Sequence, residues 1–298
     1  MRTRFNCVIA LLLVLSIFAA GRPARAVDVT VDGGRRYQTI EGFGTCLVAW
    51  AESFRKLYRT EEFQRLYIKD VGCSMLRVNM WGPTYEKPTE EWAQISYEDF
   101  DIGASGGRPQ IFIDFGQGIR KLDPAVKIIG TVWSPPAWMK LNKSITDKRS
   151  GAIRANDYGQ INNRVDPNYF RHFCKWMVEY VKLHDRFGVP FYAVSPGNEV
   201  QFTQSFESCV WDGRDYADII IMLHEMLNAE GCGHVKIFGP ETMTSHLYEG
   251  GTGSYVKAIK DNPGALAALD VFATHGYEDG VKAEMSATSS RQFWDLIK

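Results

Sequence analysis

Short apolar segments alternate with longer amphipathic segments along most of the chain. The runs Met75–Asn79, Lys127–Val132 and Phe191–Val194 have the length and apolar character of buried strands. Between them, apolar residues recur at helical spacing, most clearly from Phe170 to Val181, and Gly188 closes that stripe. This pattern predicts a chain of alternating strands and helices.

Caps and breakers place the remaining elements. Asp166-Pro167 supplies an N-cap followed by proline, and Thr60-Glu61-Glu62 is a helix start with acidic residues in its first turn. The predicted strands are Phe43–Trp50, Met75–Asn79, Lys127–Val132, Phe191–Val194, Val235–Phe238 and Leu269–Ala273. The predicted helices start at Thr60, Ile111, Pro167, Asp215 and Tyr255, with a last helix from Ser289 or Ser290.

Repeats of this kind imply a parallel sheet covered by helices, either an open doubly wound sheet or a closed (β/α)8 TIM barrel. A dinucleotide-binding doubly wound sheet would carry G-x-G-x-x-G after its first strand, and that motif is absent. Polar and aromatic residues instead follow strand after strand, as they do around barrel active sites. We therefore predict an α/β fold, a TIM barrel over residues 41–298 that is incomplete, with about six of its eight strands.

The first residues indicate where the protein works. Arg2 and Arg4 precede the apolar run Cys7–Ala20, which is shorter than the ~20 residues that a membrane span needs. Ala24-Arg25-Ala26 then gives the small-x-small pattern of a cleavage site. We predict a signal peptide over residues 1–26, no membrane anchor, and a secreted protein that is extracellular or periplasmic.

Composition narrows the choice of partners. Without the four arginines of the first 26 residues, Lys+Arg falls from 34 to 30 against 35 Asp+Glu, a net charge of −5 that excludes nucleic acid as a natural partner. The other cysteines form no C-x-x-C pair, so we expect mostly buried free thiols, no metal site and no cofactor. Eight Trp and thirteen Tyr suit a carbohydrate cleft, although core packing uses the same residues.

One glutamate has a position suited to sugar chemistry. Ser195-Pro-Gly-Asn-Glu199 directly follows the predicted strand Phe191–Val194. Glycoside hydrolysis needs a carboxylic acid that protonates the leaving oxygen and a carboxylate on the opposite face. A Glu at the C-terminal end of a barrel strand is aimed into the cleft, and Asn198 beside it can bond a sugar hydroxyl. The alternative is that Glu199 only caps the next helix or pairs with an arginine.

At this point the sequence resembles glycoside hydrolase family 30, which belongs to the clan of (β/α)8 retaining glycosidases. The resemblance covers residues 29–298, and Trp133-Ser-Pro-Pro-Ala-Trp-Met-Lys140 is its most specific motif. Gly197 and Val200 depart from the Gln and Pro that commonly flank the Asn-Glu pair in this family. The other segments that carry the resemblance are Tyr37–Gly44, Ser195–Glu199, Phe206–Trp211 and Gly239–Thr242, of which the last two resemble xylanase-like members.

The resemblance implies roles for individual residues. Glu199 would be the general acid/base, Asn198 would hold the 2-hydroxyl of the cut sugar, and Trp133 would shape that sugar's subsite. Arg77 would orient the catalytic carboxylates. The remaining substrate-binding candidates are His275 and Tyr277, which would line the cleft, and Trp81, which is either a stacking platform or a core residue.

The nucleophile departs from the family pattern. In this family it is a Glu at the end of the seventh barrel strand, whereas Glu278 and Asp279 match the loop after the sixth. Glu241 either borders the cleft or caps the following helix. We therefore expect a truncated chain with its nucleophile beyond residue 298, and residues 27–40 as the N-terminal strand of a side β-sandwich.

These observations predict an O-glycosyl hydrolase, a monomeric retaining endo-β-glycanase acting on a plant or microbial polysaccharide. The Glu207–Trp211 segment favours xylan or glucuronoxylan. The alternatives within the family are a glucosylceramidase and a β-1,6-glucanase or galactanase. A further alternative is a catalytically inactive, truncated sugar-binding remnant, whose unpaired sheet edge would make it fold poorly.

Overall fold

The computed structural model describes residues 30–36, 39–47, 49–152, 160–245, 247, 252–277 and 283–298. The chain divides into two units, Met1–Ile40 and Glu41–Lys298. In the described part of the first unit, the N–H of Gly34 donates a hydrogen bond to Asp32 Oδ1 over 3.0 Å within a turn. The predicted signal peptide lies outside the described residues, and the side-sandwich strand over residues 27–40 stays a prediction.

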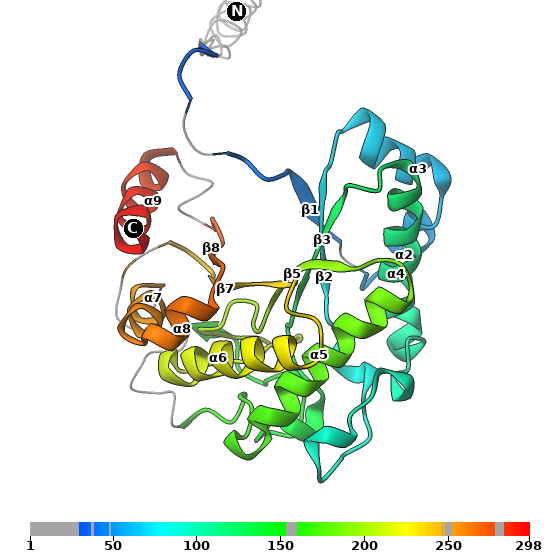
Figure 1. Ribbon diagram of the computed structural model, residues 1–298, viewed down its shortest axis with the longest axis vertical. Coiled ribbons are helices and arrows are strands. Elements are labelled where there is room, and N and C mark those ends of the chain that lie inside the picture. The colour runs from blue at the N-terminus through cyan, green and yellow to red at the C-terminus, as the bar shows by residue number, and fades with distance from the viewer. Residues whose placement is uncertain are drawn as a thin grey trace, which may run out of the picture. The chain divides into compact units, whose positions relative to one another are not determined.

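The second unit is built on a six-stranded sheet in the order β1-β2-β3-β5-β7-β8. Every neighbouring pair in it is parallel. Figure 1 shows the strands turning progressively from β1 to β8, so that the sheet curls into part of a barrel with helices outside it. The strands are β1 (Gly44–Cys46), β2 (Met75–Asn79), β3 (Lys127–Thr131), β5 (Phe191–Ser195), β7 (Lys236–Thr242) and β8 (Val271–Thr274). The predicted fold, an incomplete TIM barrel, is confirmed.

Helices connect successive strands and cover the outer face of the sheet. The α-helices among the described residues are α2 (Glu52–Tyr58), α3 (Glu61–Arg65), α4 (Ala104–Leu122), α5 (Phe170–Arg186), α6 (Gly213–Ala229), α7 (Thr252–Asp261), α8 (Pro263–Ala268) and α9 (Ala283–Ile297). The segments that follow β3 and β5 each contain one short strand, β4 (Gly151–Ala152) and β6 (Phe202–Thr203). These two strands pair as an antiparallel ribbon.

Helix α5 shows how the sequence specifies these elements. A 3₁₀ turn over Pro167–Tyr169 leads into it, and the Asp166 carboxylate accepts a hydrogen bond from the Asn168 N–H over 3.0 Å. Gly188 closes the segment with a φ of +70°, which glycine adopts without steric cost. The predicted apolar stripe is buried against the sheet, and Trp176 and Tyr180 are fully enclosed.

Several boundaries differ from the prediction. The first strand covers only Gly44–Cys46, although the N–H of Leu47 still donates to the Arg77 carbonyl over 2.8 Å, and Trp50 is 66 % exposed. The last helix begins at Ala283 rather than at Ser289 or Ser290. Helices α2 and α8 were not predicted. The helix predicted to end at Gly72 consists of α3 followed by a π-helical turn over Leu66–Asp70.

The cysteines behave as small apolar residues. Cys73, Cys174, Cys209 and Cys232 are buried, and Cys46 is partly exposed. Each of these five is a free thiol. Burial raises the pKa of the Cys209 thiol to about 11, which keeps it protonated. Packing therefore explains four of these positions, while Cys46 borders the site described next.

Candidate active site

Two glutamates at neighbouring strand ends adopt an uncommon backbone conformation. Glu199, just after β5, has a φ of +49°, and Glu241, near the end of β7, has a φ of +51°. The N–H of Glu199 donates a hydrogen bond to the Glu241 carbonyl over 2.9 Å. Non-glycine residues in the left-handed region carry strain that surrounding structure must hold, and such residues concentrate at functional sites.

His275, the residue after β8, faces both glutamates. Its Nδ1 lies 3.1 Å from Glu199 Oε1, and its Nε2 lies 3.5 Å from Glu241 Oε1. Gln204 Nε2 donates to the second oxygen of Glu199 over 3.3 Å. Burial opposes the charge on the imidazole, but the hydrogen bonds with Glu199 and Glu241 prevail and raise the pKa of His275. A protonated imidazole donates from both nitrogens and therefore satisfies both carboxylates.

Arg77 on β2 links this cluster to Asn198. Its Nη2 lies 2.8 Å from Glu241 Oε1 and 2.7 Å from Asn198 Oδ1. Its Nε donates to Thr131 Oγ1 over 3.1 Å, and its guanidinium lies 4.3 Å from the centroid of the Trp133 ring. The guanidinium is thus held by an anion, a hydroxyl, an amide and an aromatic face, which fixes its position between β2, β3, β5 and β7.

The charges of this cluster are opposite and mutually stabilising. Burial opposes the charge on Arg77, but the Glu241 carboxylate attracts it and the pKa of Arg77 is raised. Burial likewise opposes the charge on Glu241, but the attraction of Arg77 and the hydrogen bond with His275 lower the pKa of Glu241. Glu241 is therefore ionised at neutral pH, between the Arg77 guanidinium and the His275 imidazole.

The structure brings most of the predicted site residues together. Arg77, Asn198, Glu199 and His275 form one hydrogen-bonded cluster, and Trp133 packs against the Arg77 guanidinium. Tyr277 is 52 % exposed, and its ring meets His275 edge-on at a centroid distance of 5.8 Å. These positions do not by themselves assign roles, which stay proposals.

Trp81 has a mixed environment. Its side chain is 4 % exposed, and its Nε1–H donates to Ser105 Oγ over 2.9 Å. The Arg108 guanidinium lies 4.5 Å from the centroid of its ring. Trp81 also borders the cavity described below, so it combines the two alternatives, core and cleft, that the sequence left open.

Sequence reasoning missed three members of the site. It left Glu241 open between cleft and helix cap, and it did not single out Gln204 or Cys46. Cys46 Sγ accepts a hydrogen bond from Arg77 Nη1 over 3.4 Å. The sequence signals for Glu241 were its position after a predicted strand and its place in the family-like segment Gly239–Thr242, and the predicted strand Val235–Phe238 stopped short of it. Glu278 and Asp279 lie outside the described residues.

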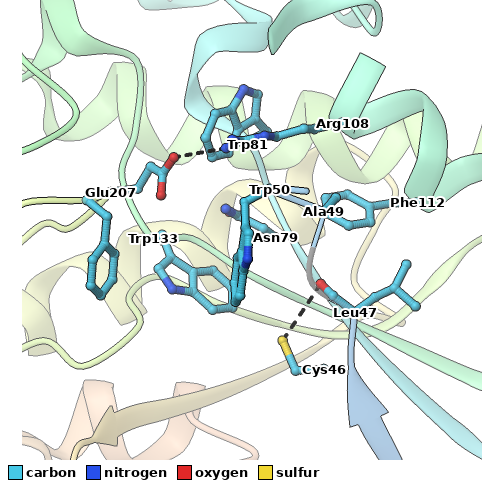
Figure 2. A pocket seen from close by; sticks show the side chains of 11 residues that line it. Cys46, Leu47, Ala49, Trp50, Asn79, Trp81, Arg108, Phe112, Trp133 and Glu207 are labelled. Atoms are coloured by element: carbon cyan, nitrogen blue, oxygen red, sulfur yellow. Dashed lines mark hydrogen bonds and ion pairs between the residues drawn. The ribbon is translucent and has the colours of Figure 1, made fainter. Parts of the chain in front are cut away.

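A cavity of about 460 Å³ adjoins the cluster and shares Trp133 with it. Figure 2 shows the side chains of Trp50, Trp81 and Trp133 around this space, with the ion pair between Arg108 and Glu207 at one side. The cavity is lined by Cys46, Leu47, Ala49, Trp50, Asn79, Trp81, Arg108, Phe112, Trp133, Phe206 and Glu207. Its aromatic walls and few polar groups have the character of a small-molecule or sugar site.

Among the described residues, no group of three or more His, Cys, Asp and Glu side chains is arranged to hold a metal ion. None of the helices described combines the length and the apolar character that a membrane crossing requires.

Comparisons with known proteins bear on the family and the fold of this chain. Residues 65–210 match the model of the glycosyl hydrolase family 30 TIM-barrel domain. The endo-1,6-beta-D-glucanase of Neurospora crassa is 30 % identical over 188 residues, which cover 58 % of this chain and 35 % of that enzyme. The chain spans about a third of the length of the curated relatives it matches.

Solved structures show the same fold. An endo-beta1,6-glucanase superposes with a TM-score of 0.66 at 19 % identity, covering 89 % of this chain and 57 % of that one. A family 30 subfamily 8 xylanase from Clostridium acetobutylicum gives a TM-score of 0.58 at 18 % identity, covering 87 % of this chain and 55 % of that one. Residues 65–210 are thus similar to the TIM-barrel domain of glycosyl hydrolase family 30, and the described chain has the fold of solved enzymes of this kind.

Proposed function

We propose that the protein is a retaining β-glycoside hydrolase in which Glu199 is the general acid/base. The observation that carries this proposal is the placement of Glu199 at the C-terminal end of β5, inside the family-matched segment. Its carboxylate is nearly buried, yet both of its oxygens are held by neighbouring side chains, His275 and Gln204. A carboxylate fixed in this way is oriented before substrate arrives.

In the first step Glu199 gives its proton to the glycosidic oxygen while a second carboxylate attacks the anomeric carbon. The C–O bond to the leaving group breaks and a glycosyl–enzyme ester forms. In the second step Glu199 takes a proton from water, whose oxygen attacks the anomeric carbon and displaces the ester, so that Glu199 is again an acid and the nucleophile is again a carboxylate. Retention requires the two carboxyl groups to lie roughly 5–5.5 Å apart.

Glu241 is the other buried acid of the cluster, and we assign it a positioning role. Its side chain is only 4 % exposed and is paired with Arg77 over 2.8 Å. Together with His275 it holds the elements around Glu199 in register. A carboxylate that compensates a buried guanidinium is a poor nucleophile, because ester formation would leave Arg77 without its anion.

Asn198 is suited to bind a sugar hydroxyl. A guanidinium can only donate hydrogen bonds, so the Asn198 atom that faces Arg77 is the oxygen, Oδ1, at 2.7 Å. This contact fixes the orientation of the amide plane and leaves the NH₂ group as the donor toward substrate. The 2-hydroxyl of the cut sugar accepts such a bond, which strengthens in the transition state.

For the substrate we propose a β-glucan with β-1,6 linkages, ahead of xylan. The xylan prediction came from the Glu207–Trp211 segment. Trp211, however, is 1 % exposed and packs against Phe173 at a ring-centroid distance of 5.2 Å, so it is a core residue. The 30 % identical relative is an endo-1,6-beta-D-glucanase, whereas the xylanase likeness is one of fold at 18 % identity.

The test is hydrolysis by the protein produced from its complete reading frame. β-1,6-Glucan, xylan and glucosylceramide are offered in parallel, and the anomer released first is identified by proton NMR. We expect β-1,6-glucan to be cut with retained configuration, and Glu199→Gln to slow this cleavage by about 10²–10⁴-fold. First products of inverted configuration would overturn the mechanism, and cleavage of xylan alone would overturn the substrate assignment.

We also propose export through residues 1–26. Expression of the complete reading frame in a secreting host, followed by N-terminal sequencing of the secreted product, tests this directly. A mature protein that begins at Val27 is the expected result, and a cell-retained protein with an intact Met1 end contradicts the proposal.

A further inference from the structure

The cavity beside the Glu199 cluster has walls that match the faces of a sugar ring. Trp50 is 66 % exposed and Phe206 is 50 % exposed, although both are large apolar side chains that folding normally covers. Trp81 and Trp133 line the same space (Figure 2). Exposed aromatic rings around a concave surface are typical of sites that stack the C–H faces of a ligand.

Trp133 connects this cavity to the site around Glu199. It lines the cavity and also lies against the guanidinium of Arg77, whose Nη2 holds Asn198. Glu199 itself does not line the cavity. The cavity therefore adjoins the Glu199 cluster through Trp133 without including the Glu199 carboxylate.

The cavity has few polar groups: one ion pair and two buried atoms without a hydrogen-bond partner among the described residues. Arg108 Nη1 lies 3.0 Å from Glu207 Oε1, and each side chain is 23 % exposed. Arg108 Nε and Asn79 Oδ1 are buried without a hydrogen-bond partner among the described residues. One is a donor and the other is an acceptor, and a sugar hydroxyl both donates and accepts.

We propose that this cavity binds a second, neutral sugar ring of the substrate, and that the Arg108–Glu207 pair determines its selectivity. The inference rests on the proposed glycosidase function and specifies its substrate class further. Glu207 already compensates the charge of Arg108, so a sugar carboxylate in this space would face an anion without gaining an unpaired cation. A neutral ring instead gains the aromatic faces of Trp50 and Trp133 together with the two unpartnered polar atoms.

The test is calorimetric titration of the protein with β-1,6-linked glucose oligomers of one to three units, and with an oligomer of equal length that carries a glucuronosyl end. We expect affinity to rise about tenfold from one unit to two or three, and Trp50→Ala to remove that rise. Glu207→Gln frees the Arg108 charge, so it should improve binding of the glucuronosyl oligomer about tenfold relative to the neutral one.

Asp114→Asn is the matched control. Asp114 lies on the same helix as Arg108 and pairs with Arg59 over 3.0 Å, but it does not line the cavity. It should leave all affinities unchanged. Affinity that does not depend on oligomer length, or an unaltered preference in Glu207→Gln, overturns the assignment of this cavity even where the protein hydrolyses glucan. Failure of the protein both to bind and to hydrolyse any oligomer overturns the proposed function as well.

Discussion

The Nδ1 atom of His275 lies 3.1 Å from Oε1 of Glu199 and thereby joins the end of β8 to the end of β5. The other ring nitrogen faces Glu241 Oε1, and the guanidinium of Arg77 stands beside that carboxylate. His275 is thus the cross-link that fixes the general acid/base candidate to the rest of the buried charges. Its protonation state is coupled to the stability of the whole cluster.

The first prediction concerns the pH dependence of stability. His275 faces Glu199, Glu241 and Arg77, and its pKa is raised above the ordinary 6.5 although burial opposes this. The stabilisation it provides is complete below that ordinary value and is lost as pH rises through the raised pKa. The melting temperature of wild type should therefore exceed that of His275→Asn most at acidic pH, and the difference should shrink as pH increases.

Thermal melts monitored by circular dichroism from about pH 5 to pH 9 provide the measurement, since this window spans the ordinary His pKa. The control is His224→Asn, which changes an exposed histidine on α6 and should leave the melting profile unaltered. A gap between wild type and His275→Asn that is equal at all pH values would show that the imidazole contributes by packing alone.

The second prediction concerns Glu241. In Glu241→Gln the Arg77 guanidinium remains buried without its anion, since Arg77 is 17 % exposed and Glu241 4 % exposed. Removing one partner of a buried pair is costly, so the free energy of unfolding should fall by about 3 kcal/mol. Urea denaturation at pH 7 measures the change.

The comparison variant is Glu52→Gln, which breaks an exposed pair with Lys56 on α2 and should have no measurable effect. The two variants make the same chemical change in opposite environments. Equal stability of Glu241→Gln and wild type would mean that water or another anion compensates Arg77, and would argue against a positioning role for Glu241.

The sequence was most informative where burial on both faces leaves a short apolar run. Strand β2 has the predicted bounds, Met75–Asn79, and β3 ends one residue earlier than predicted. The start of α9 was misplaced because an apolar pattern becomes recognisable only near Phe293. Helix α2 was missed because Phe54 and Leu57 are substantially exposed and leave no clear inward stripe.

The candidate site was predictable only in its individual residues. The strand-end position of Glu199 and the family motif indicated its role, but no local pattern shows that Arg77 reaches Asn198, which is 121 residues away in the sequence. The same limit applies to Glu241, whose importance comes from its contacts with Arg77 and His275. The pairing of charges that are distant in the sequence depends on the order of the strands in the sheet. This order cannot be read from local patterns in a single sequence.

The third prediction concerns a buried lysine outside the charge cluster. The Nζ of Lys140 donates to Ser134 Oγ over 3.1 Å, to Asn163 Oδ1 over 2.5 Å and to the Ser208 carbonyl over 2.7 Å. Lys140→Met preserves most of the volume but removes these donors, so the free energy of unfolding should fall by about 2–3 kcal/mol. The neighbouring exposed Lys143→Met is the control and should change it far less.

Alkaline pH distinguishes this account from a simple loss of packing. Burial lowers the pKa of Lys140 to about 8, below its ordinary 10.5. Between about pH 8 and pH 10.5 the Lys140 amine binds more protons in the unfolded chain than in the folded chain. The contribution of Lys140 to the stability of the wild-type fold therefore grows as pH rises through this range. The difference between wild type and Lys140→Met should therefore widen above pH 8 in urea titrations. A difference that narrows instead would show that the charged form is the one that the site stabilises.

The last prediction separates the two steps in which Glu199 is proposed to act. Glu199→Gln cannot give a proton to the leaving oxygen, so cleavage of an unactivated glucan should slow by about 10²–10⁴-fold. An aryl glucoside with a strongly acidic phenol needs no such proton, so formation of the glycosyl–enzyme ester should remain fast while its hydrolysis, which needs the base, becomes slow. The measurement is a burst of phenol release followed by a slow steady rate, recorded with the protein from its complete reading frame.

The control is Gln204→Ala, which removes only a hydrogen bond to Glu199, at 3.3 Å, and should keep the steady rate within about tenfold of wild type. If Glu199→Gln lowers the rates on the glucan and on the aryl glucoside equally, and no burst of phenol is seen, Glu199 does not serve as the acid.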